Sequence, residues 1–147
     1  KRMKSIRPMS SAPDGEDLIP RGFHVHLDCV GYMPPVSDDH RWILDLMREA
    51  VRNSHAREVH AHVVPFDGSV SPPGFAAVVL IDESHVTAHC YSDRGLLAID
   101  AFTCGMTEPE IIIDHLLQSI TAEIPTLQVV NRNRTARFLH DYSIESL

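Results

Sequence analysis

The sequence lacks the features that mark several common classes of protein. It has only three cysteines, no Cys-x-x-Cys pair, one tryptophan and 6% aromatic residues. Three widely spaced cysteines favour free thiols over a disulfide scaffold or a thiol-based metal site. No apolar run approaches the length that spans a bilayer. The net charge of −7 argues against a nucleic-acid partner, so we expect neither a membrane nor a nucleic-acid protein.

The length of 147 residues fits one ordinary domain. The first residues are basic, but polar sequence with prolines follows them instead of the apolar stretch of a secretory signal. We therefore expect a cytoplasmic location. Residues 1–22 show no periodicity and predict a flexible lead-in, residues 23–131 predict the folded domain, and residues 132–147 predict a polar tail.

Alternation of apolar and polar residues predicts six strands. They cover residues 23–30, 58–64, 75–82, 85–91, 96–102 and 127–131. The segment SDRG at 92–95 predicts a hairpin turn between two of them.

Two segments with helical spacing complete the pattern. Ser37 is placed to cap a helix over about 38–54, and Thr107 with Glu110 resembles a capping box before a helix that ends near residue 122. The apolar face of the second helix is predicted from Ile111, Ile112, His115, Leu116 and Ser119. The element order predicts an α/β (α+β) fold, a two-layer sandwich of a mostly antiparallel sheet with both helices on one face.

Histidine is abundant, with ten residues, and several histidines are spaced to share one face of a strand. These are His24 with His26, His60 with His62, and His85 with His89. Such pairs occur in metal sites but also at ordinary solvent-facing positions. Because no carboxylate or cysteine completes a recognised metal signature, the sequence predicts no metal site.

One block of sequence concentrates reactive side chains. Ser84, His89 and Cys104 lie within twenty-one residues on adjacent predicted strands, a grouping that is common by chance. The string ESHVTAHCYSDRGLLAIDAFTCG, however, closely resembles the core of the prokaryotic S-adenosylmethionine decarboxylases. Glu-Ser-His begins that block, a histidine lies five residues after the serine, and Phe-Thr-Cys-Gly closes it. A looser resemblance extends from about Phe23 to Val130.

The resemblance implies a role for each motif residue. The chain would cleave itself between Glu83 and Ser84, and Ser84 would become a pyruvoyl group that forms a Schiff base with the substrate amine. His89 would assist this processing as a base, since its ordinary pKa lies near working pH. Cys104 would return a proton to the substrate, because a thiol is mostly protonated at neutral pH. Cys29 and Cys90 are predicted to be core residues.

The expected substrate contacts depart from the family pattern. Tyr91 stands where a tryptophan is typical, and Asp93 stands where a glutamate is usual. Val70 occupies the place of a second aromatic residue, for which Phe66 could substitute. A family serine aligns with Ala76, although Ser69 or Ser71 could take its part.

These departures leave the substrate open. S-adenosylmethionine is slightly favoured, and the alternative is L-ornithine or L-arginine, with Asp93 or Asp67 as the carboxylate partner of the cationic side chain. Either product would enter polyamine synthesis, spermidine synthesis in the favoured case. A second alternative is a non-catalytic paralogue that keeps the fold without processing.

The resemblance also implies a homodimer of processed protomers, each active site drawing residues from both. A one-sided sheet would gain from such pairing, because its second face needs cover. We therefore expect a four-layer αββα dimer that takes a small-molecule substrate.

Overall fold

The computed structural model describes residues 19–140 of the chain. Most of the predicted lead-in (1–18) and the end of the predicted tail (141–147) lie outside the described residues. In chain order the elements are β1 (Gly22–Val30), α1 (Asp39–Arg52), β2 (Glu58–Phe66), β3 (Gly74–Ile81), β4 (Ser84–Tyr91), the 3₁₀ turn η1 (Ser92–Arg94), β5 (Leu96–Cys104), α2 (Pro109–Glu123) and β6 (Gln128–Arg137).

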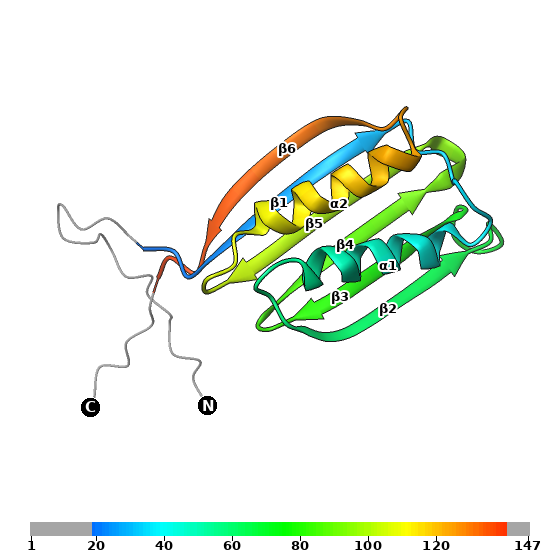
Figure 1. Ribbon diagram of the computed structural model, residues 1–147. Coiled ribbons are helices and arrows are strands. Elements are labelled where there is room, and N and C mark those ends of the chain that lie inside the picture. Colours follow the sequence, from blue (N-terminus) through cyan, green and yellow to red (C-terminus); the bar gives the residue numbers. More distant parts are fainter. Residues whose placement is uncertain (1–18, 141–147) are drawn as a thin grey trace, which may run out of the picture.

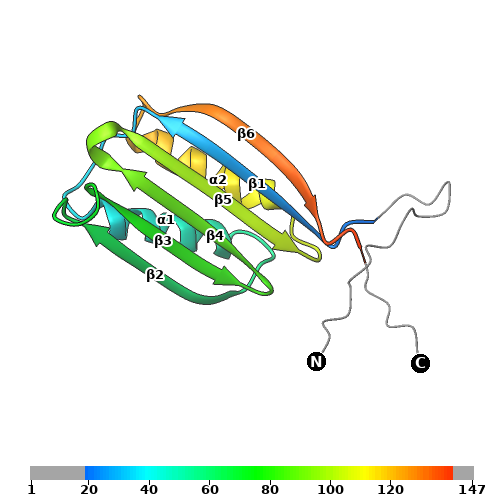
Figure 2. The same cartoon turned by 180° about the vertical axis from the view of Figure 1, so that it is seen from behind.

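The six strands form one antiparallel sheet in the order β2-β3-β4-β5-β1-β6. Both helices cover the same face of this sheet (Figure 1), and the view from behind shows the other face without helices (Figure 2). The predicted two-layer α+β sandwich is therefore confirmed. We call the face without helices the open face.

The core lies between the helices and the sheet. Alternate residues of each central strand point into it, for example Val86, Ala88 and Cys90 of β4. From α1 the core receives Ile43, Met47, Ala50 and Val51, whose spacing gives the helix a single apolar stripe. The intervening strand residues consequently face away from the helices.

The helix ends differ from their predicted caps. The structure places Asp38, not Ser37, at the N-cap of α1, and Glu108, not Thr107, at the N-cap of α2. Neither cap residue makes a side-chain hydrogen bond to its helix. Pro109 begins α2 instead, because a proline needs no N–H acceptor in the first turn. Both predicted caps are therefore wrong, while the extent of each helix is close to the prediction.

The predicted face of α2 was only partly right, since Ile112 and Leu116 are buried as predicted. Ile111 is exposed, whereas Ile112, Ile113, Leu116 and Ile120 are buried. Three consecutive isoleucines place apolar side chains around most of a helical turn. The sequence therefore does not show which side of the helix faces the core there.

Strand β6 continues well beyond its predicted end at residue 131. It runs to Arg137 and pairs antiparallel with the whole of β1. Its polar residues resembled a tail because β6 is an edge strand, with most side chains exposed. Residues 132–137 therefore belong to the sheet.

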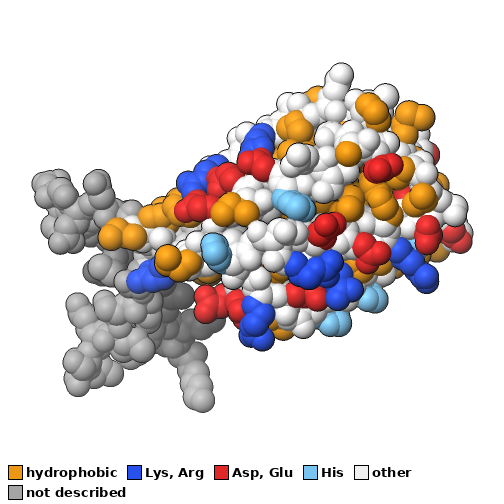
Figure 3. Space-filling view, viewed as in Figure 1, with side chains coloured by type: hydrophobic (Ala, Val, Ile, Leu, Met, Phe, Trp, Pro, Cys, Tyr) orange, Lys and Arg blue, Asp and Glu red, His pale blue; other side chains and the backbone are white. Residues whose placement is uncertain are grey.

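The two faces of the molecule differ in chemistry. Figure 3 shows acidic and basic side chains intermixed over the helix face. The open face carries six of the ten histidines, namely His24, His26, His60, His62, His85 and His89. Neither helix within residues 19–140 is long and apolar enough to cross a membrane.

Candidate active site

The predicted cleavage site lies in a strained hairpin turn. Asp82 and Glu83 connect β3 to β4. Ile81, the last residue of β3, pairs with Ser84, the first residue of β4. Glu83 has a φ of 64°, in the left-handed region that normally requires glycine or asparagine at such a position. Arg57 anchors the turn through two hydrogen bonds to the Asp82 carboxylate, 2.6 and 3.0 Å long. The residue just before the predicted cleavage point thus has a costly backbone conformation.

Ser84 begins β4 on the side that faces the helices. Its side chain is buried, with 9% of the residue exposed, and its Oγ has no hydrogen-bond partner within the described residues. Buried hydroxyls are normally paired, because an unmade hydrogen bond costs about 1–3 kcal/mol. A hydroxyl without a hydrogen-bond partner in the described part of the chain, next to a residue with a strained backbone, is available to attack the preceding carbonyl carbon.

Cys104 lies at the end of β5 beside this turn. Glu83 and Cys104 line one cavity of about 700 Å³, and Glu83 and Ser84 line another of about 510 Å³. The other two cysteines differ. Burial, together with the charge of Asp28, raises the pKa of Cys29 to about 11. Burial, together with Asp39 and Asp93, raises the pKa of Cys90 to about 12, so both remain inert core thiols.

A hydrogen-bond network occupies the open face next to Ser84. The Asp100 carboxylate in β5 lies 2.5 Å from Nε2 of His24 and 3.2 Å from Nε2 of His85. It also accepts a hydrogen bond from the Thr87 hydroxyl. Burial by itself raises the pKa of Asp100, but the bonds from His85, Thr87 and His24 outweigh burial and hold that pKa well below its usual range.

The hydrogen bond at Nδ1 of His24 decides which ring nitrogen of His24 carries the proton. Nη1 of Arg137 lies 3.0 Å from Nδ1 of His24. A guanidinium can only donate, so Nδ1 accepts and the ring proton lies on Nε2, toward Asp100. His24, His85 and Asp100 are also close enough together to hold a metal ion. A metal at Nε2 would need the proton on Nδ1, however, where Arg137 donates.

His89 and Tyr91 lie at the opposite end of β4. Both face away from the helices, and both line an apolar cavity of about 300 Å³ together with Asp28 and Val130. Tyr91 is half exposed. An aromatic ring in an apolar depression suits the stacking of a flat ligand group.

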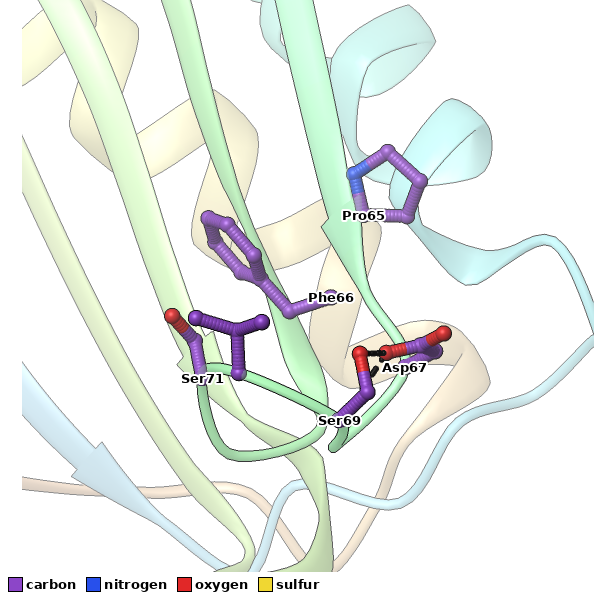
Figure 4. A pocket seen from close by; sticks show the side chains of 6 residues that line it. Pro65, Phe66, Asp67, Ser69 and Ser71 are labelled. Atoms are coloured by element: carbon purple, nitrogen blue, oxygen red, sulfur yellow. Dashed lines mark hydrogen bonds between the residues drawn. The ribbon is translucent and has the colours of Figure 1, made fainter.

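The loop from β2 to β3 forms a second depression at this end. Phe66 and Val70 line a cavity of about 390 Å³ with Asp67, Ser69 and Ser71. Figure 4 shows these side chains around the loop, with Asp67 hydrogen-bonded to Ser69. Val70 is 97% exposed, and Phe66 is the aromatic residue among those that line this cavity. Ser69 and Ser71 lie in the loop before β3, at the same end of the sheet as Ala76, which pairs with His89.

The structure thus divides the predicted site residues into two groups. Glu83, Ser84 and Cys104 meet at one end of the sheet, which we call the Ser84 end. The other group lies at what we call the Tyr91 end, where the strand registers align Phe66, Gly74, Tyr91, Leu96 and Val30. Five residues of extended strand place His89 about 17 Å from Ser84 along β4, on the other face of the strand. Asp93 lies in η1 and lines none of these cavities.

Sequence reasoning missed Asp100, Thr87 and Arg137. One signal was present, since Asp100 is a charged residue inside the apolar strand segment LLAIDAF. A carboxylate at such a position needs partners, and the antiparallel pairing of β5 with β1 and β4 supplies them.

Comparison with known proteins places the chain in a family. The profile of the S-adenosylmethionine decarboxylase family matches residues 23–133. The S-adenosylmethionine decarboxylase proenzyme of Brevibacillus brevis is 34% identical over 103 residues, which is 69% of this chain and 74% of that protein. The proenzyme of Thermococcus gammatolerans is 28% identical over 76% of each chain.

A solved structure agrees with this assignment at the level of the fold. The crystal structure of the adenosylmethionine decarboxylase from Aquifex aeolicus superposes with a TM-score of 0.61 and 20% sequence identity. The match covers 86% of this chain and 98% of that one. The chain belongs to the S-adenosylmethionine decarboxylase family.

Proposed function

We propose that this protein is a self-cleaving decarboxylase of S-adenosylmethionine that makes its pyruvoyl group from Ser84. The observation that carries the proposal is a buried Ser84 hydroxyl, without a hydrogen-bond partner among residues 19–140, directly after the left-handed Glu83. The substrate assignment rests on the relatives, which are named for S-adenosylmethionine.

The turn supplies what self-cleavage needs. The Ser84 Oγ attacks the carbonyl carbon of Glu83, so the peptide bond is exchanged for an ester and the strain at Glu83 is released. A base removes the Cα proton of Ser84, and elimination frees the Glu83 carboxylate and leaves dehydroalanine. Addition of water and loss of ammonia then give the ketone. Ser84 fits the pyruvoyl role because no hydrogen bond within the described part of the chain holds its hydroxyl.

The finished group supplies an electron sink once it has condensed with the substrate amine. Cys104 has a separate task. Its thiol lies in the cavity that contains Glu83, where it can return a proton to the α-carbon after carbon dioxide leaves. The product is an amine for polyamine synthesis.

The separation of His89 from Ser84 supports a dimeric site. If two open faces pack about a two-fold axis that runs across the strands, the Ser84 end of one protomer lies over the Tyr91 end of its partner. His89 and Tyr91 of the partner subunit then complete the site that Ser84 and Cys104 begin. This arrangement would also cover the apolar groups exposed on the open face, such as Leu80 and Val64.

The test is intact mass spectrometry of the purified protein, followed by release of labelled carbon dioxide. S-adenosylmethionine, L-arginine and L-ornithine are compared in parallel. We expect two chains divided between Glu83 and Ser84, with S-adenosylmethionine as the preferred substrate. Preference for either amino acid would overturn the substrate assignment alone.

The matched control is Ser84→Ala, which removes only the hydroxyl. It should remain a single chain and release no carbon dioxide. If the wild-type chain also stays whole and inactive, the protein is a non-catalytic member of the fold and the proposal fails.

A further inference from the structure

Arg137 differs from the other arginines of β6. Arg132 pairs with Asp114 at 2.9 Å, and Arg134 pairs with Glu108 at 3.0 Å and Glu110 at 2.6 Å. These acids belong to helix α2 or its N-cap. Arg137 lies on the opposite side of the strand, and no carboxylate of residues 19–140 forms an ion pair with it. Its positive charge is therefore not neutralised by that part of the chain.

The guanidinium is nevertheless held in place. It donates to Nδ1 of His24 over 3.0 Å, and its central carbon lies 5.0 Å from the centroid of the Phe102 ring. His24 is in turn fixed by Asp100. A neutral histidine acceptor and an aromatic ring orient the group without cancelling its charge.

The position of Arg137 connects it with the reactive serine. Arg137, Ser84, His85 and Phe102 line the same cavity of about 510 Å³, whose other wall includes Val59 and Leu80. Glu83 also lines this cavity, yet it forms no ion pair with Arg137. An oriented, unneutralised guanidinium in a partly apolar cavity is suited to bind a carboxylate through two parallel hydrogen bonds.

We propose that Arg137 binds the α-carboxylate of the substrate. This inference rests on the proposed function, in which the substrate amine must reach the group at Ser84. The carboxylate is the only anionic group of S-adenosylmethionine and shares a carbon with that amine. The family profile ends at residue 133, so the family match does not assign Arg137 a role.

The role has a kinetic signature. The carboxylate loses its charge as carbon dioxide leaves, so an ion pair with Arg137 stabilises the bound substrate more than the transition state. Loss of Arg137 should therefore raise KM, while kcat stays the same or increases. A residue with a merely structural role would lower kcat or the yield of cleaved protein.

Direct binding separates this inference from catalysis. The Ser84→Ala chain keeps the cavity but cannot form the pyruvoyl group. Calorimetry on this background compares S-adenosylmethionine with its methyl ester, in which the carboxylate is neutral. Arg137→Met should weaken binding of the acid about 10- to 100-fold and leave the ester nearly unchanged. Arg137→Lys should restore part of the affinity for the acid, because lysine keeps the charge without the fork.

Arg132→Met is the matched control, since it removes an arginine of the same strand that faces α2. It should bind both ligands like the parent. Equal losses for acid and ester, no loss for either, or no binding of either ligand to the uncleaved parent would overturn the inference. Failure of the proposed function would show separately, as an uncleaved and inactive wild-type chain.

Discussion

The two ends of the sheet are built in different ways. The Ser84 end consists of strand termini, a two-residue turn and a network in which Asp100 binds three side chains from two neighbouring strands. The Tyr91 end consists of a loop, the turn η1 and cavities lined partly by exposed side chains such as Phe66 and Tyr91. Hydrogen bonds fix the first end, whereas the second can change without disturbing the sheet.

The sequence differences follow the same division. The residues that resemble the family closely, from Glu83 to Ser84 and at Cys104, are at the Ser84 end, and the departures Tyr91, Asp93 and Val70 are at the other. Chemistry that creates a group within the chain demands fixed geometry, while recognition of a ligand allows substitution. His89 is the exception, because it matches the family motif but lies at the Tyr91 end.

The largest expected effect is on the rate of self-cleavage, and it tests whether His89 of one protomer acts on Ser84 of the other. His89→Ala alone should cleave about 10²- to 10⁴-fold more slowly, since it lacks the proposed base. Co-expressed with Ser84→Ala, the His89→Ala chain should be cleaved, because its Ser84 meets the intact His89 of the other chain. Differently tagged chains and intact mass reveal which chain is cut.

His62→Ala is the control for this experiment, since His62 is an exposed histidine of the same open face. It should cleave without help. Absence of cleavage in the mixture would show that His89 does not act in trans, and unaided cleavage of His89→Ala would remove it as the base.

The second prediction concerns the rigidity of the Ser84 end. Asp100→Asn should lower the free energy of unfolding by about 2 kcal/mol at pH 7, because an amide cannot accept all three hydrogen bonds of the carboxylate. The depressed pKa of Asp100 means that its ionisation stabilises the folded chain above its unfolded pKa, about 4. That contribution should be lost as the pH falls below this value.

Urea unfolding of uncleaved Ser84→Ala chains, at one protein concentration and several pH values, measures this effect. Asp28→Asn is the matched control from the Tyr91 end, where Asp28 accepts a single bond of 3.2 Å from Asn131. Its effect should stay within about 0.5 kcal/mol. Equal effects of the two substitutions would contradict the proposed contrast between the ends.

The third prediction addresses recognition at the Tyr91 end. Tyr91→Ala should raise KM for S-adenosylmethionine about 10-fold through loss of ring stacking, and Tyr91→Trp should restore or improve it. Self-cleavage should be unaffected in both variants, and the extent of cleavage by intact mass serves as an internal control. A cleavage defect in Tyr91→Ala would show that the two ends are not separable in this way.

Local patterns predicted the strands well, because residues such as Val25 and Leu27 alternate with polar neighbours on a half-buried sheet. They failed over residues 132–137 of β6, where polar side chains bind partners distant in sequence, as when Arg132 pairs with Asp114. They also misplaced Ile111 of α2, because three consecutive isoleucines do not show which side of the helix is buried.

Candidate site residues could be predicted only where they lie together in one continuous segment of sequence. The motif pointed to Ser84, His89 and Cys104 as candidates, but spacing alone cannot show that Ser84 and His89 face opposite sides of β4. The partners of Asp100 include His24, 76 residues away. Such contacts depend on strand order, which the sequence did not specify.

The smallest expected effect measures the strain at the cleavage turn. Glu83→Gly should stabilise the uncleaved Ser84→Ala chain by about 1 kcal/mol, because glycine adopts a positive φ without steric cost. In the chain that retains Ser84, the same relief should slow self-cleavage about five-fold if the strain is released as Ser84 attacks. Cell-free synthesis followed by a denaturing gel measures that rate. Glu83→Ala removes the carboxylate but keeps the strained backbone, so it should change neither quantity by as much. If alanine and glycine act alike, the side chain and not the backbone controls the turn.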